Sequence, residues 1–439
     1  MTEQPSVTRR SLDFLRYIRL IAIAALIAVL VTLVIAGLFH AIRLLSLAAG
    51  MELERYEDAP IWLRSTLPLV GFLLLMTYVR VFRVDGRDVG GTHTLNRMAN
   101  FNCEFPWRNA AMQFVSAATA LAAGFSGGRD GPGLHLGAWV ASTFRPRLRL
   151  TRAEADLLIR TGMTAAIAAG FHTTFAAVLF VAGIIKTEPM SARSFMPLTI
   201  AAALGSVLST WLGVDQLAVG TRIYSTLGAI EWLFVIAMSV PILLVGIATM
   251  RLVIDFTRVR GPLYARIMVM ALLTAGLAAV FPDVLGLGYD TLTALEQNQL
   301  GVGVLYLTAF VTIKLLLTSA SVAFGVPLGV IGPTIVNGGV LGALCYTAFS
   351  LVFPDLIVAP ASLYVLLGAA ALLGTVFNVP FAAIVFFLEI TMNLWLTLQV
   401  ALTILLAHEC KIKLWGTQSI FEARLAAQGI NVRARTDVI

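Results

Sequence analysis

Hydrophobic residues along this chain come in long runs that polar residues seldom interrupt. The run at 20–39, LIAIAALIAVLVTLVIAGLF, contains no charged residue. A helix of about 20 apolar residues is long enough to cross the hydrocarbon core of a bilayer. Further apolar runs follow at 66–79, 110–123, 163–181, 198–212, 232–250, 267–280, 304–313, 363–376 and 381–407. The pattern predicts an all-α, polytopic membrane protein.

Several of these runs are too short for a full span, and many contain Gly or Pro. Because every backbone N–H and C=O needs a partner in hydrocarbon, short or broken helices survive only where protein or an aqueous cavity surrounds them. The pattern therefore predicts broken and re-entrant helices that line a pathway.

Composition agrees with a membrane location, because 59% of the 439 residues are hydrophobic and only 13% are charged. The first apolar run exceeds the core of a typical signal peptide, and many others follow it, so we expect it to persist as a helix. The arginines before it predict a cytoplasmic tail at 1–19. We expect one half of the fold at 20–212, a second at 213–408, and a final helix with a cytoplasmic tail at 409–439.

The formal net charge of +7 does not indicate nucleic-acid binding, because the 31 Lys and Arg residues lie between apolar runs, as loop anchors do. Three scattered cysteines and five isolated histidines show no spacing typical of a disulfide framework or a metal site. We expect no metal and no cofactor.

The chain also repeats itself. The segment GFSGGRDGPGLHLG from Gly124 matches GVPLGVIGPTIVNG from Gly325, and FHTTFAAVLF from Phe171 matches FNVPFAAIVF from Phe377. In the first pair, Gly124, Gly128, Gly131, Pro132 and Gly137 stand in register with Gly325, Gly329, Gly332, Pro333 and Gly338. Two halves, each with a Gly-rich break and an apolar helix after it, predict a duplicated transporter-like fold with its site between the repeats. Whether the repeats are inverted does not follow from the sequence.

The Gly-rich breaks have a physical interpretation. Pro132 suits the first turn of a helix that begins near Gly131, and the glycines before it leave backbone amides open to a ligand. A helix N-terminus carries unpaired N–H donors and a partial positive charge, so it favours an anion. The same arrangement recurs at Gly332 and Pro333, so two helix starts could converge on one anion within the membrane.

These segments resemble the CLC family of chloride channels and chloride/proton antiporters. GRDGPGLHLGA resembles that family's GREGP segment, and KLLLTSASVAFGVPLGVIGP resembles the segment that ends in GxFxP. FNVPFAAIVFFLEIT resembles the helix that follows, QSIFEARLAAQG resembles the final helix, and VGGTHTL falls where GSGIP belongs. The resemblance covers nearly the whole transmembrane chain in order. It implies an inverted-repeat fold, an anion pathway in each subunit, and a homodimer.

The resemblance assigns roles to particular residues. Asp130 stands at the position of the gating glutamate, a carboxylate that competes with chloride until it is protonated. The serine of GSGIP falls on Gly90, which leaves the amides of Gly90, Gly91 and Thr92, and the Thr92 hydroxyl, to coordinate the anion. Phe421 replaces a tyrosine and keeps the aromatic ring without its hydroxyl.

Four further positions complete the implied anion site. The family's coordinating amides fall on Val330 and Ile331, and the glutamate that marks the fluoride-exporting branch is absent near Val330. Arg129 and Gly131 lie beside the gate, with Gly128, Pro132, Gly329, Gly332 and Pro333 as supports of the two breaks.

Structural roles compete with some of these assignments. Arg129 could be a structural charge that caps carbonyls, and Asp130 could be the N-cap of its own helix or an ion-pair partner of Arg129. An ionisable residue inside a membrane is nevertheless functional by default. Phe421 could be core packing. His93 and His135 are interpreted as satisfied polar groups, and Lys314 and Glu389 as residues that hold helices together.

An intramembrane serine protease is a distant alternative. GFSGG places a G-x-S-G motif around Ser126, with His135 or His172 as a possible base. The second copy of the repeat has no serine there, and a hydrolase needs no duplicated anion-binding break. We therefore favour transport of chloride or a similar monovalent anion, and no enzymatic activity.

Proton coupling depends on a second carboxylate in typical antiporters of this family. That position falls on Ile184, whose aliphatic side chain cannot carry a proton, and Glu188 is a possible substitute. This difference favours passive, channel-like conduction over proton-coupled exchange. The expected partners are a monovalent anion, lipid, a second copy of the chain and, for coupled exchange, protons. The expected location is a bacterial inner membrane, with both termini on the cytoplasmic side.

Overall fold

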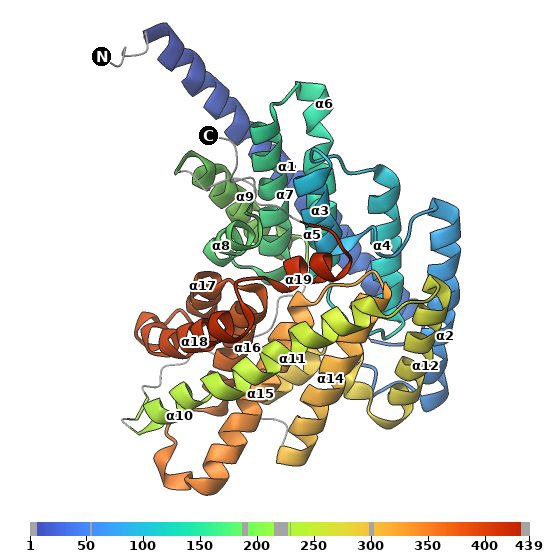
Figure 1. The fold of residues 1–439 in the computed structure, drawn as a ribbon, viewed down its shortest axis with the longest axis vertical. Coiled ribbons are helices and arrows are strands. Elements are labelled where there is room, and N and C mark those ends of the chain that lie inside the picture. The colour runs from blue at the N-terminus through green and yellow to red at the C-terminus, as the bar shows by residue number, and fades with distance from the viewer. Residues whose placement is uncertain are drawn as a thin grey trace.

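The computed structural model describes residues 7–52, 55–186, 192–214, 227–228, 230–297 and 303–431. Its elements are helical throughout (Figure 1). They are α1 (Val7–Ala48), α2 (Ile61–Phe82), α3 (Gly90–Asn100), α4 (Trp107–Ala122), α5 (Asp130–Ser142), α6 (Phe144–Leu148), α7 (Arg152–Phe171), α8 (Phe175–Ile184), α9 (Ala192–Trp211), α10 (Glu231–Ala237), α11 (Ser239–Arg258), α12 (Leu263–Val280), η1 (Pro282–Val284), α13 (Tyr289–Glu296), α14 (Val304–Phe324), α15 (Ile331–Val352), η2 (Pro354–Leu356), α16 (Ala361–Phe377), α17 (Pro380–Thr391), α18 (Leu394–Trp415) and α19 (Ile420–Ala427).

Eight helical stretches of the described chain are long and apolar enough to cross a membrane. Several others, including α8, α16 and α17, are apolar but shorter. The prediction of an all-α membrane protein with broken and re-entrant helices is confirmed.

Two helical units repeat along the chain. In the first, α4 leads through the break at 124–129 into α5, then α7 and α8; in the second, α14 leads through 325–330 into α15, then α16 and α17. In each unit two helices cross at a pair of glycines, Gly137 with Gly162 and Gly338 with Gly368. A Cβ on any of these four would meet the partner's backbone, so glycine sets how closely the helices approach.

The two breaks lie side by side and pair with each other. The amide of Gly128 donates to the carbonyl of Gly329 at 2.7 Å, and the amide of Gly329 donates to the carbonyl of Gly128 at 2.7 Å. These residues also stand opposite each other in the aligned repeat. A reciprocal antiparallel pair between equivalent residues is what a local two-fold axis produces, as in inverted-repeat transporters.

Two of the predicted apolar runs are divided by a left-handed turn, and a third, 232–250, is divided between α10 and α11 at Met238. The run at 163–181 is divided between α7 and α8 at His172, and the run at 381–407 is divided between α17 and α18 at Met392. Both residues have left-handed backbone, with φ of 56° and 51°, and end the preceding helix. The polar residues at these turns, His172, Thr173, Thr174 and Asn393, interrupt the apolar runs only briefly, so the pattern at this scale did not reveal the turns.

The proposed division into halves stays a prediction. Helix α1 begins at Val7 and runs through the boundary at residue 19, and α18 runs through the boundary at residue 408. Helix α19 lies in the middle of the molecule, between helices of the first and second units (Figure 1). It packs against α3, α11 and α16, so the final helix contributes to the centre of the fold.

Candidate functional site

Four helix starts surround a small cavity at the centre of the molecule. Helices α3, α5, α15 and α19 begin at Gly90, Asp130, Ile331 and Ile420. The cavity has a volume of about 20 Å³. Its lining residues are Gly90, Gly91, Thr92, Gly131, Val253, Val322, Leu328, Gly329, Val330, Ile420, Phe421 and Arg424. The structure thus brings together six predicted anion-binding residues, Gly90, Gly91, Thr92, Gly131, Val330 and Phe421, and the predicted support Gly329.

Asp130 reaches across the paired breaks to the second repeat. Its Oδ2 accepts a hydrogen bond from the amide of Gly332, at 2.7 Å, in the first turn of α15. The side chain is only 6% exposed. The residue before α5 is Arg129, and that helix has no side-chain cap, so Asp130 does not act as the N-cap of its own helix. A carboxylate at this position occupies the place where a helix N-terminus would hold a free anion.

Glycine is required where the carboxylate meets α15. A Cβ on Gly332 would lie 3.1 Å from Asp130 Oδ2 and 2.9 Å from the hydroxyl of Tyr289. A Cβ on Gly131 would lie 2.8 Å from the Cα of Gly329. Side chains at either position would therefore disturb the gate or the pairing of the two breaks.

Arg129 lies away from the cavity lining. Its guanidinium lies over the ring of Phe39, at 3.5 Å from the ring centroid, and 5.5 Å from the centroid of Tyr289. Contact with a ring face stabilises a cation within a membrane protein. This geometry agrees with the structural interpretation of Arg129; its assignment as an anion ligand stays a prediction.

Phe421 closes one side of the cavity against α3. A Cβ on Gly91 would lie 3.0 Å from two ring atoms of Phe421, so the ring packs directly on the start of α3. The ring also contacts Phe377 edge-on, with centroids 5.3 Å apart. Phe421 therefore packs against its neighbours and also lines the cavity. Core packing and a place in the anion site are compatible roles for this residue.

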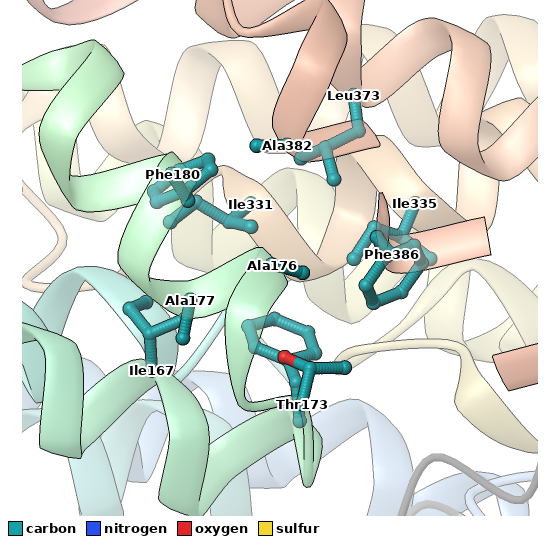
Figure 2. A pocket seen from close by; sticks show the side chains of 11 residues that line it. Ile167, Thr173, Ala176, Ala177, Phe180, Ile331, Ile335, Leu373, Ala382 and Phe386 are labelled. Carbon is teal, nitrogen blue, oxygen red and sulfur yellow. The ribbon is translucent and has the colours of Figure 1, made fainter. Parts of the chain in front are cut away.

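A second cavity, of about 20 Å³, lies beside the first turn of α15 (Figure 2). Ile331 lines this cavity and not the one that contains Val330. Its lining is apolar apart from Thr173, whose hydroxyl oxygen stands out among the side chains in Figure 2. The residues that line it are Ile167, Phe171, Thr173, Ala176, Ala177, Phe180, Ile331, Ile335, Leu373, Ala382 and Phe386. No carboxylate is among them.

Buried polar side chains hold both breaks in place. The amide nitrogen of Gln113 on α4 donates to the carbonyl of Pro327 at 2.8 Å, and the hydroxyls of Ser126 and Thr318 are 2.7 Å apart. Lys314 donates from Nζ to three consecutive carbonyls, those of Val284, Leu285 and Gly286, at 3.0, 3.0 and 2.8 Å. The prediction that Lys314 joins helices agrees with these bonds.

Glu389 holds the start of α8 in place. Its carboxylate accepts the amides of Thr174, Phe175 and Ala176 at 3.1, 2.7 and 3.2 Å. These N–H groups would otherwise have no partner, because the first turn of a helix cannot satisfy them. Glu389 therefore ties α17 to α8, as the sequence predicted.

The histidines form contacts away from Ser126. His93 and His135 stack with ring centroids 5.4 Å apart, and His172 Nε2 lies 3.1 Å from Ser209 Oγ. His93 Nε2 and both ring nitrogens of His135 have no hydrogen-bond partner of ordinary geometry among the described residues. The description of these two side chains as satisfied polar groups stays a prediction, because a hydrogen-bond interaction with the backbone of Gly90 also acts on the His135 ring. The buried Ser126 hydroxyl is engaged by Thr318, so no serine–histidine pair forms at the GFSGG segment.

The position expected to carry a proton in typical antiporters is apolar here. Ile184 is the last residue of α8 and is 1% exposed. Glu188 lies outside the described residues. Two residues after Ile184, Lys186 forms an ion pair with Glu422 at 3.2 Å. Glu422 follows Phe421 in α19, so the structure places a carboxylate near the end of α8 that sequence reasoning had not singled out.

Arg424 is the other residue that sequence reasoning missed. It lines the central cavity and is 9% exposed. The available signal was its spacing: residues three apart on a helix share a face, so Arg424 lies on the same side of α19 as Phe421. Histidine, cysteine and acidic side chains form no group suited to a metal ion within the described ranges.

Comparisons with known proteins agree with this architecture. The family model described as voltage gated chloride channel matches residues 70–411. The H(+)/Cl(-) exchange transporter ClcA of Salmonella paratyphi B is 24% identical over 365 residues, which cover 78% of this chain and 73% of that protein. ClcA of Citrobacter koseri is 25% identical over the same shares of both chains.

Solved structures share the fold. A slow cyanobacterial Cl-/H+ antiporter superposes with a TM-score of 0.81 at 16% identity, over 93% of this chain and 98% of that chain. A CLC-type fluoride/proton antiporter superposes with a TM-score of 0.78 at 20% identity, over 96% and 99%. The duplicated arrangement of broken helices is therefore a known transporter architecture.

Proposed function

The chain belongs to the voltage gated chloride channel family, the CLC family, and we propose that it exchanges chloride or a similar monovalent anion for protons. Membership makes the chain a membrane transporter of anions and not an enzyme, which rules out the serine-protease alternative. Proton-coupled exchange is the activity in the names of the ClcA relatives. We therefore favour proton-coupled exchange over the passive conduction that the aliphatic side chain of Ile184 had indicated.

The observation that carries this proposal is the carboxylate of Asp130 on the amide of Gly332. An anion that binds at the N-terminus of α15 must displace this carboxylate. A proton that binds to the carboxylate removes its negative charge, so it weakens the bond to the helix and leaves room for the anion. One side chain can thus link proton binding to anion movement.

The proton must also leave the gate on the other side of the site. The apolar cavity beside Ile331 offers only the hydroxyl of Thr173, and Ile184 offers no ionisable group. Glu422 is the carboxylate that the structure places near the end of α8. We propose Glu422 as the proton acceptor, with Glu188 as the alternative from the sequence.

Uncoupled conduction is the second candidate, because the apolar lining and Ile184 argue against a chain of titratable groups. Proteoliposomes with the full chain distinguish the two. With the voltage clamped by valinomycin and potassium, a chloride gradient should drive uphill proton uptake that disappears in Asp130→Ala. Chloride flux without proton movement would establish uncoupled conduction.

The assembly and location are part of the same proposal. The cavity is complete within one chain, so each subunit of a homodimer would carry its own pathway. We propose a bacterial inner membrane, with both termini cytoplasmic because of the arginines that precede the first span. Light scattering of the detergent-solubilised protein tests the dimer, and protease accessibility of tags at each terminus tests the orientation.

A further inference from the structure

We propose that Arg424 is a direct anion ligand, whose guanidinium supplies the cationic hydrogen-bond donors of the central cavity. This inference rests on the proposed anion transport and names a residue that acts in it. The guanidinium belongs to a side chain that is 9% exposed and lines the cavity together with Thr92 and Phe421.

Arg424 is a buried cation that forms no ion pair with the residues that the structure describes. Its Nε has no hydrogen-bond partner there. A buried charge without a partner is strongly destabilising, and ionisable residues inside membranes face a cavity or a partner. A bound anion in the adjoining cavity would provide that partner.

The guanidinium has unused donors on its other nitrogens. Nη2 donates to the carbonyl of Val322 at 2.7 Å, and Nη1 lies 3.4 Å from the Thr92 hydroxyl, a long distance for a hydrogen bond. Arginine has five N–H donors, so these contacts leave several available. The other polar lining groups are backbone amides and one hydroxyl, which makes Arg424 the full positive charge among the residues that line this cavity.

Two further arginines extend the positive charge from this cavity. The charges of Arg87 and Arg266 act on Arg424, so the three lie close enough to repel one another. Arg87 is exposed, whereas Arg266 is 4% exposed and has no hydrogen-bond partner for its guanidinium among the described residues. Positive charges close to a buried cavity raise the local concentration of anions.

The chemistry of arginine also indicates which anions bind well. A guanidinium is planar and weakly hydrated, and it offers parallel donors to planar oxyanions. Nitrate matches this geometry, while a strongly hydrated anion such as fluoride does not. We therefore expect nitrate to bind at least as tightly as chloride.

Calorimetry on the purified full-length protein, titrated with chloride and with nitrate, tests the inference. Arg424→Met should weaken chloride binding by about 10- to 100-fold, the range expected for loss of a hydrogen bond to a charged group. Arg424→Lys keeps the charge but loses the parallel donors, so its nitrate-to-chloride affinity ratio should fall. The exposed Arg260 provides a matched control, and Arg260→Met should bind both anions as the parent does.

A folded Arg424→Met protein with the parental chloride affinity would overturn the inference. Lower thermal stability with unchanged affinity would likewise do so, because it would reduce Arg424 to a cap on the carbonyl of Val322. If Arg424→Met does not fold, an unchanged nitrate-to-chloride ratio in Arg424→Lys overturns it. The outcome is separate from proton coupling: binding that depends on Arg424 in a protein that moves no protons would support this inference and refute the proposed exchange.

Discussion

Neutralising Asp130 should strengthen anion binding and remove its pH dependence. The carboxylate accepts the amide of Gly332 at 2.7 Å, where an anion would otherwise bind. A hydrogen bond to a charged group contributes about 1.5–3 kcal/mol. An anion that no longer has to displace this bond should bind about 10- to 100-fold more tightly in Asp130→Ala.

The sign of the pH effect follows from the same competition. In the parent, protonation of Asp130 removes the competing charge, so anion flux should rise as the pH falls. In Asp130→Ala there is no carboxylate to protonate, and the profile should be flat at or above the parental maximum. Asp130→Asn separates charge from volume, because its amide oxygen can still accept the Gly332 amide without a negative charge.

The assay combines chloride calorimetry in detergent with chloride efflux from proteoliposomes between pH 4.5 and 8, roughly the range over which carboxylates with raised or ordinary pKa values titrate. Asp255→Asn is a suitable control, because that carboxylate is exposed on α11. Loss of flux in a folded Asp130→Ala protein would refute the gate and assign the carboxylate a purely structural role. Unchanged chloride affinity would refute the competition.

Three further substitutions test the surrounding structure. Gly91→Ala should weaken chloride affinity severalfold in calorimetry, because the new Cβ would lie 3.0 Å from the ring of Phe421 and shift it; parental affinity would show that this contact is loose. Glu389→Gln should lower thermal stability by about 1–3 kcal/mol through weaker capping of α8, with the anion preference unchanged; a changed preference would place Glu389 in the pathway. Ser126→Ala should leave chloride flux within about twofold of the parent, since its hydroxyl only shares a hydrogen bond with Thr318; abolished flux would contradict this supporting role.

The sequence determined the membrane location, the helical class and the duplication. These properties depend on local composition and spacing, because about 20 apolar residues suffice to span a bilayer and equivalent glycines recur in register. The same local chemistry predicted helix starts beside Pro132 and Pro333, since proline and glycine act on their own stretch of backbone. Both starts lie within two residues of these prolines in the structure.

The site itself was decided by contacts between residues that are far apart in the chain. Asp130 meets Gly332, and Glu389 caps α8 from across the repeat. Arg424, in the last helix, reaches the cavity beside Thr92. A local pattern specifies that a carboxylate or a guanidinium is present, but not which amide, carbonyl or cavity it meets. Packing of the two repeats around the Gly128–Gly329 pair provides those partners, because buried polar groups must be satisfied by whatever the fold brings within reach.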